Sequence, residues 1–343
     1  MTTPRPLHRA IAPAAICAVA LWSLKPIFIE LIEDHVGFAE TYLLCGSIAV
    51  LTSLALAAFS PRTVRSVARM RGGLARAVAN SATSGLFLAL WYYGFYRALI
   101  AGPSAPDATV IAFSWPLITV VAIRLIAPST APGLRWFQWL LLALSFVGVA
   151  AISLNSAGGL HSLGQGSGSL EILWAVAAAF GSGLYLPFAM NAATSFREGA
   201  GLSGPVSVLV SISIANAVAL CATWLTLTIF RQPLDFSGVT ASTVLVCLII
   251  GLGTYLVAEI AWTWAVQSGG TLTLASLPYF SPAVSVLLLA ILFGETLRAL
   301  TLAGLALILA ANLTLHFTGR EKEWNQGAED EMSESPQGTE WTH

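Results

Sequence analysis

Ten long apolar stretches, separated by short polar breaks, constrain the fold of this chain more than any other feature. Each supplies roughly 20 residues or more, enough helix at about 1.5 Å per residue to cross a hydrocarbon core about 30 Å thick. We therefore predict an all-α integral membrane protein with ten transmembrane helices. The predicted spans are residues 10–32, 37–59, 74–100, 105–127, 135–154, 170–194, 203–229, 239–267, 271–293 and 298–318.

The composition supports a protein embedded in lipid. Of the 343 residues, 56% are hydrophobic and only 10% are charged, which excludes an ordinary soluble domain. The cysteines lie inside predicted spans without the close spacing of metal ligands, so we interpret them as packing residues. They are Cys17, Cys45, Cys221 and Cys247. We expect no metal, no cofactor and no nucleic-acid partner.

The basic residues predict the orientation of the helices, because cytoplasmic loops carry an excess of Lys and Arg. With both termini in the cytoplasm, the inner segments hold 12 of the 16 basic residues. The first apolar stretch follows Arg5 and Arg9, as in a signal peptide. It continues to Ile32 and nine further stretches follow, so we predict a retained helix.

The spans form two groups of five, and an odd number of helices per group inverts the second group relative to the first. We divide the chain into a first repeat at 1–154, a Gly/Ser-rich linker at 155–169, a second repeat at 170–318 and an acidic, disordered tail at 319–343. Such inverted repeats are typical of transporters and enclose a central cavity.

Four prolines are candidate hinges, because proline removes a backbone hydrogen bond and bends a helix. Span four carries Phe113-Ser114-Trp115-Pro116 and span nine carries Tyr279-Phe280-Ser281-Pro282, each with an aromatic residue three positions before the proline. Pro26 and Pro187 form a second, more loosely matched pair. Kinks that serve helix packing alone remain an alternative to hinges.

Two charged residues are predicted to lie deep within spans, although a central charge costs at least about 2.5–3.5 kcal/mol on insertion scales. Lys25 follows Trp22 by three residues and so shares its helical face. Glu259 shares a face with Tyr255 and Trp262. The two charges are candidate ligand contacts, but a structural ion pair and an outward-reaching Lys25 both remain open. We interpret Asn191 and Asn216 as helix–helix hydrogen-bonding residues.

Deep aromatic residues suggest what a cavity would hold. Tyr92 and Tyr96 form an i, i+4 stripe on one face, while Trp136, Trp139 and Trp174 fall at span ends and are typical of the membrane interface. Aromatic rings near charges suit a flat or cationic organic solute. The candidate substrate-binding residues are Trp22, Lys25, Tyr92, Tyr96, Trp115, Tyr185, Glu259 and Tyr279.

Residues 10–318 resemble the drug/metabolite transporter superfamily, EamA type. The resemblance rests on the two groups of five spans, the proline-bearing fourth and ninth spans, and Phe-Gly-Glu-Thr at 293–296 before the last span. It implies a ten-helix basket of two inverted repeats in a bacterial inner membrane. The central cavity would be lined mainly by helices one, three, four, six, eight and nine, which carry the candidate residues.

The leading hypothesis is export of aromatic and other amino acids, or related metabolites, by alternating access. Lys25 would attract the solute carboxylate and Glu259 its ammonium, while aromatic rings stack on the side chain. No GxxxxGK[ST] motif for nucleotide phosphates is present. The alternatives are efflux of toxic organic cations, a channel and, more remotely, an intramembrane enzyme; we expect no enzyme. The expected partners are a small-molecule substrate and the lipid bilayer, and the oligomeric state stays open.

Overall fold

The computed structural model of this protein is helical throughout the part that it describes, with no strand there. The described residues are 5–32, 35–58, 60–70, 72–101, 111–112, 114–126, 135–156, 168–269, 277–294, 297, 299–311 and 313–315. The acidic tail and the middle of the predicted linker lie outside these ranges.

The helices follow the apolar stretches closely. In chain order they are α1 (Arg5–Glu30), α2 (Phe38–Ala58), α3 (Pro61–Ala68), α4 (Leu74–Ala101), α6 (Trp115–Ile126), α7 (Trp136–Ser156), α8 (Gly168–Ala200), α9 (Gly204–Ile229), α10 (Ala241–Leu248), a π-helix η3 (Ile249–Ala258), α11 (Glu259–Gly269), a 3₁₀ turn η4 (Leu277–Tyr279) and α13 (Phe280–Phe293). Residues 299–311 and 313–315 are also helical.

Five of the described helical segments are long and apolar enough to cross a membrane: Ile11–Glu30, Ala39–Leu56, Ile172–Ala200, Gly204–Ile229 and Ala241–Ser268. The prediction of an all-α, membrane-compatible protein is therefore confirmed. Many large apolar side chains point outward from these helices, among them Ile16, Leu51 and Leu245. A surface of this kind is stable in lipid, where aliphatic side chains lose nothing by exposure.

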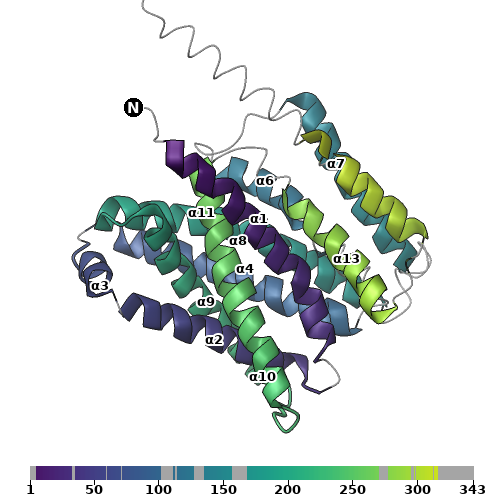
Figure 1. Cartoon of the computed structure of the whole chain (residues 1–343), viewed down its shortest axis with the longest axis horizontal. Helices are drawn as coiled ribbons and strands as arrows, with labels where there is room; N and C mark the ends of the chain where they lie inside the picture. Colours follow the sequence, from purple (N-terminus) through teal and green to yellow (C-terminus); the bar gives the residue numbers. More distant parts are fainter. Residues whose placement is uncertain are drawn as a thin grey trace, which may run out of the picture.

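The helices pack as one bundle around α1, α4 and α8 (Figure 1). The continuous helix formed by α10, η3 and α11 contacts α1, while α4 packs along α8 and α9. At one side of the bundle α7 lies against the last helix, where Gly148 meets the backbone of Gly304. The largest cluster of buried side chains lies between α1, α2, α4, α8, α9, η3 and α11.

Pro116 and Pro282 differ from the predicted mid-helix kinks. Pro116 is the second residue of α6, after a turn in which Ser114 N–H donates to the Ile111 carbonyl at 3.1 Å. Pro282 is the third residue of α13, which follows the 3₁₀ turn η4. A proline in the first helical turn sacrifices no hydrogen bond, because the N–H groups there have no helical partner.

The other two prolines lie inside helices as expected, Pro26 in α1 and Pro187 in α8. Helix boundaries around the predicted linker differ by two residues, since α7 runs to Ser156 and α8 begins at Gly168. No predicted span covers α3, whose start is marked by Ser60 followed by Pro61. The predicted span at 239–267 is not one regular α-helix, because the π-helix η3 interrupts it.

Candidate functional site

Lys25 lies in the interior of the bundle, with only 2% of its surface exposed. Its Nζ atom faces four aromatic rings: Trp91 at 5.2 Å, Tyr92 at 4.9 Å, Phe95 at 4.9 Å and Tyr255 at 5.0 Å from the ring centroids. This Nζ forms no hydrogen bond with any described residue. An ammonium among ring faces is attracted by their quadrupoles, so cation–π contacts take the place of a hydrogen-bonding partner.

Glu259, the first residue of α11, is the second buried charge of the site. The Tyr185 hydroxyl and the Trp22 indole lie close to its carboxylate, and its charge acts on Lys25. One carboxylate oxygen, Oε2, and the Tyr185 hydroxyl nevertheless have no hydrogen-bond partner in the described part of the chain. The site thus holds a buried cation and a buried anion with unused bonding capacity.

Three tryptophans from three helices form a triangle beside Glu259. The Trp22 ring meets Trp115 at 5.5 Å and Trp262 at 5.6 Å, and Trp115 meets Trp262 at 6.0 Å, all edge to face. Edge-to-face contact is a favoured geometry for aromatic rings. The indole N–H of Trp262 has no hydrogen-bond partner among the described residues.

Three tyrosines form a second aromatic group next to Lys25. Tyr92 stacks on Tyr255 at 4.0 Å, and Tyr42 of α2 meets both rings, at 5.4 and 5.9 Å. Burial leaves the Tyr92 hydroxyl without a partner in the described structure. We call the residues of this site the central cluster: Trp22, Lys25, Tyr42, Trp91, Tyr92, Phe95, Trp115, Tyr185, Tyr255, Glu259 and Trp262.

The π-helix η3 helps to position the central cluster. A π-helix forms i→i+5 hydrogen bonds, is rare, and is frequently found at functional sites. Here η3 carries Tyr255 and leads directly into Glu259. From α9, Asn216 Nδ2 donates a hydrogen bond of 2.8 Å to the Tyr255 carbonyl, which confirms the interpretation of Asn216 as a helix–helix contact.

The structure brings together six of the eight predicted binding residues: Trp22, Lys25, Tyr92, Trp115, Tyr185 and Glu259. Tyr96 lies in α4 and Tyr279 ends η4, but their side chains are outside the described structure. Tyr42, Trp91 and Phe95 were missed. The i, i+4 spacing of Trp91 and Phe95 could have indicated them, since they form a stripe next to that of Tyr92 and Tyr96.

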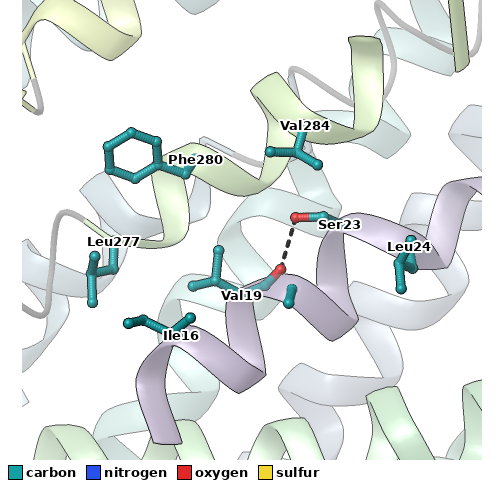
Figure 2. Close-up of a pocket in the computed structure, with 8 residues that line it drawn as sticks. Ile16, Val19, Ser23, Leu24, Leu277, Phe280 and Val284 are labelled. Atoms are coloured by element: carbon teal, nitrogen blue, oxygen red, sulfur yellow. Dashed lines mark hydrogen bonds between the residues drawn. The ribbon is translucent and has the colours of Figure 1, made fainter. Parts of the chain in front are cut away.

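Within the described part of the chain, two hollows on the outside of the bundle are lined by neither Lys25 nor Glu259. The first, of about 380 Å³, lies between α1 and η4–α13 (Figure 2). Its walls are aliphatic and aromatic apart from Ser23, whose hydroxyl donates to the Val19 carbonyl at 2.8 Å. The second, of about 580 Å³, lies between α4, α8 and α9.

Comparison with known proteins supports the fold alone. No protein-family model and no curated protein matches the sequence. A solved structure described only as "Crystal structure of protein" is similar, with a TM-score of 0.60 and 19% sequence identity. The match covers 92% of this chain and 99% of the other. The helical architecture is therefore shared with a protein of known structure over almost its whole length.

Proposed function

We propose that this protein exports aromatic and other neutral amino acids, or related metabolites, across a bacterial inner membrane by alternating access. The observation that carries the proposal is the central cluster: a buried ammonium and a buried carboxylate, both incompletely hydrogen-bonded, surrounded by aromatic rings. An amino-acid zwitterion offers the complementary carboxylate and ammonium, and an aromatic side chain matches the ring-lined walls.

The broken fourth and ninth stretches support the inverted repeat that alternating access requires. Trp115-Pro116 begins α6 and Phe280-Ser281-Pro282 begins α13, each after a turn. Discontinuous helices in corresponding positions of two halves are a common feature of transporter binding sites. We therefore propose ten spans in two inverted repeats, at 1–154 and 170–318, and membership of the drug/metabolite transporter superfamily of EamA type.

The cluster favours zwitterions over organic cations. A permanent cation would gain from Glu259 but would be repelled by the Lys25 ammonium, which lies inside the same aromatic group. A zwitterion that places its carboxylate at Lys25 and its ammonium at Glu259 satisfies both charges. The role of each residue follows: Lys25 attracts the carboxylate, Glu259 attracts the ammonium, and rings such as Tyr92 contact the side chain.

Transport into proteoliposomes tests the proposal. We expect uptake of labelled phenylalanine faster than in empty liposomes, with no need for ATP. Lys25→Met should reduce phenylalanine uptake by about tenfold or more, because a charge-assisted hydrogen bond is worth roughly 1.5–3 kcal/mol. Arg62→Gln, which removes a charge from the exposed surface of α3, is the matched control and should leave uptake unchanged.

Substrate analogues separate the two charged residues. Phenethylamine lacks the carboxylate and is a cation at neutral pH, so Lys25→Met should not slow its transport and should raise it by removing the repulsion. 3-Phenylpropionate lacks the ammonium and is an anion, so Glu259→Gln should likewise raise its transport rather than slow it. Uptake no faster than in empty liposomes for every amino acid tested would overturn the proposal. Preferred transport of a quaternary ammonium compound would replace it with cation efflux.

A further inference from the structure

The 580 Å³ hollow between α4, α8 and α9 has two chemically different ends. Along α4 its lining runs from Leu86 through Leu90 and Tyr93 to Arg97, at the i, i+3 and i+4 spacing of one helical face. That stripe is about 16 Å long at 1.5 Å per residue. Leu86 marks the apolar end and Arg97 the polar one, so the hollow is elongated and amphipathic.

The hollow adjoins a close contact between α4 and α9. At Gly85 an added Cβ would lie 2.4 Å from the Ala215 carbonyl oxygen, so the two backbones touch there. One turn before, the Ser81 hydroxyl donates to that of Ser211 at 3.4 Å. The hollow lies beyond this contact, along Leu86 to Arg97 of α4 and along Ala222 to Phe230 at the end of α9.

Hydrogen-bond donors without partners gather at this hollow. Arg97 Nε and Trp174 Nε1 are buried and bond to no described residue. Trp174 is held in place by edge-to-face contact with Tyr93 at 5.3 Å. No Asp or Glu lines the hollow among the described residues, so its polar groups call for an anion.

The apolar end opens sideways. Leu86, which lines that end, is 56% exposed on the outer surface of the bundle. A ligand that lies partly in the bilayer can therefore enter from the side without crossing the bundle. The other hollow, between α1 and α13, lacks any charged lining residue and gives no comparable indication of a ligand.

We infer that the hollow between α4, α8 and α9 binds an anionic lipid-like molecule, with its acidic head group on Arg97 and the Trp174 indole and its acyl chain along Leu86, Ala89 and Ala222. The head group accepts hydrogen bonds from the unused donors, and its net negative charge is attracted by the guanidinium. In a zwitterionic head group a cation offsets the charge of the phosphate, so this attraction is weaker. The anionic molecule is either a membrane phospholipid or a free fatty acid. This inference does not depend on the proposed transport function.

Native mass spectrometry of the delipidated full-length protein in neutral detergent tests it, with phosphatidylglycerol, phosphatidylcholine and oleate added separately. We expect phosphatidylglycerol or oleate to bind at least about tenfold more tightly than phosphatidylcholine. Binding of oleate without phosphatidylglycerol would identify a free acid as the ligand, and the reverse a phospholipid.

Two variants and one control locate the site. Arg97→Gln should remove the preference for anionic lipid, and Ala222→Phe should weaken binding by filling the chain-binding end while leaving Arg97 in place. Arg231→Gln is the matched control, because Arg231 is an exposed arginine beside Phe230 that does not line the hollow. If Arg97→Gln does not fold, the inference is tested by lipid binding to Ala222→Phe and by the preference of the wild-type protein for anionic over neutral lipid. Equal binding of anionic and neutral lipid, or equal losses in Arg97→Gln and Arg231→Gln, would overturn the inference.

Discussion

Lys25 and Glu259 each carry a charge into the interior at considerable cost. Transfer of an ion from water to such an environment costs several kcal/mol even after relaxation, whereas each ring contact of Lys25 returns only about 0.5–2 kcal/mol. The Coulomb attraction between the two residues supplies part of the balance. Neither charge is therefore explained by stability alone, and both remain available to a ligand of opposite charge.

A double-mutant cycle measures how far these two charges stabilise each other. Lys25→Met and Glu259→Gln alone should each lower the thermal stability of the protein, because each leaves the other charge buried and uncompensated. The double variant should lose less stability than the sum of the losses in the two single variants, with a coupling energy of about 0.5–3 kcal/mol. Thermal unfolding of the four proteins in one detergent gives this quantity. Strict additivity would show that the two charges do not stabilise each other.

The hydrogen bond from Asn216 to the Tyr255 carbonyl offers a second test at the level of single residues. Asn216→Leu should lower the free energy of unfolding by about 1–3 kcal/mol, because the buried carbonyl loses its side-chain donor. Asn191→Leu, at a half-buried position on α8, removes the same amide and serves as the control. Equal losses in the two variants, measured by thermal unfolding, would mean that the Asn216 bond contributes nothing particular.

At the scale of the helices, η3 packs closely against α2. At Gly251 an added Cβ would lie 2.6 Å from the carbonyl oxygen of Cys45, so α2 and η3 touch backbone to backbone. At Gly253 the nearest atom is the tip of the Leu21 side chain, at 3.3 Å. A side-chain methyl group can move aside, whereas a carbonyl inside a helix cannot move without its helix.

These two glycines make a matched pair. Gly251→Ala should destabilise the protein by about 1–3 kcal/mol, since overpacking forces α2 and η3 apart. Gly253→Ala should change stability by a few tenths of a kcal/mol at most, because Leu21 can adopt another rotamer and alanine favours a helix over glycine. The measurement is again thermal unfolding in detergent. A larger loss in Gly253→Ala would contradict this view of the α2–η3 contact.

The whole molecule is a helical bundle with an apolar exterior, and its proposed orientation depends on the distribution of positive charge. Twelve of the 16 basic residues fall on one side when both termini are cytoplasmic. Most of them precede residue 136, so the orientation of the first half is better specified than that of the second.

Reporter fusions test this orientation. A fluorescent protein fused after residue 318 should fluoresce, because it folds in the cytoplasm, and alkaline phosphatase inserted near residue 160 should be active, because that enzyme requires the oxidising outer side. Neutralising the Arg residues of α3 should weaken the preference for this membrane orientation, as read by both assays. Active phosphatase at both positions would refute the predicted topology.

The helices could be predicted from the sequence because their cause is local. Long apolar stretches must satisfy every backbone group within the segment when lipid surrounds them, and a helix does so. The same reasoning identified Lys25 and Glu259, since charges stand out in an apolar background. It did not predict η3 or the helix starts at Pro116 and Pro282, which depend on contacts with other helices and on adjoining turns.

The faces that meet were decided only by the tertiary structure. By spacing alone, the stripe of Trp91 and Phe95 and that of Tyr92 and Tyr96 are equally good candidates to face the interior. Packing against α1 and η3 places Trp91, Tyr92 and Phe95 around the Lys25 ammonium. In lipid both sides of a helix can be apolar, so composition leaves the rotation of each helix undetermined. Close side-chain and backbone contacts between helices determine it.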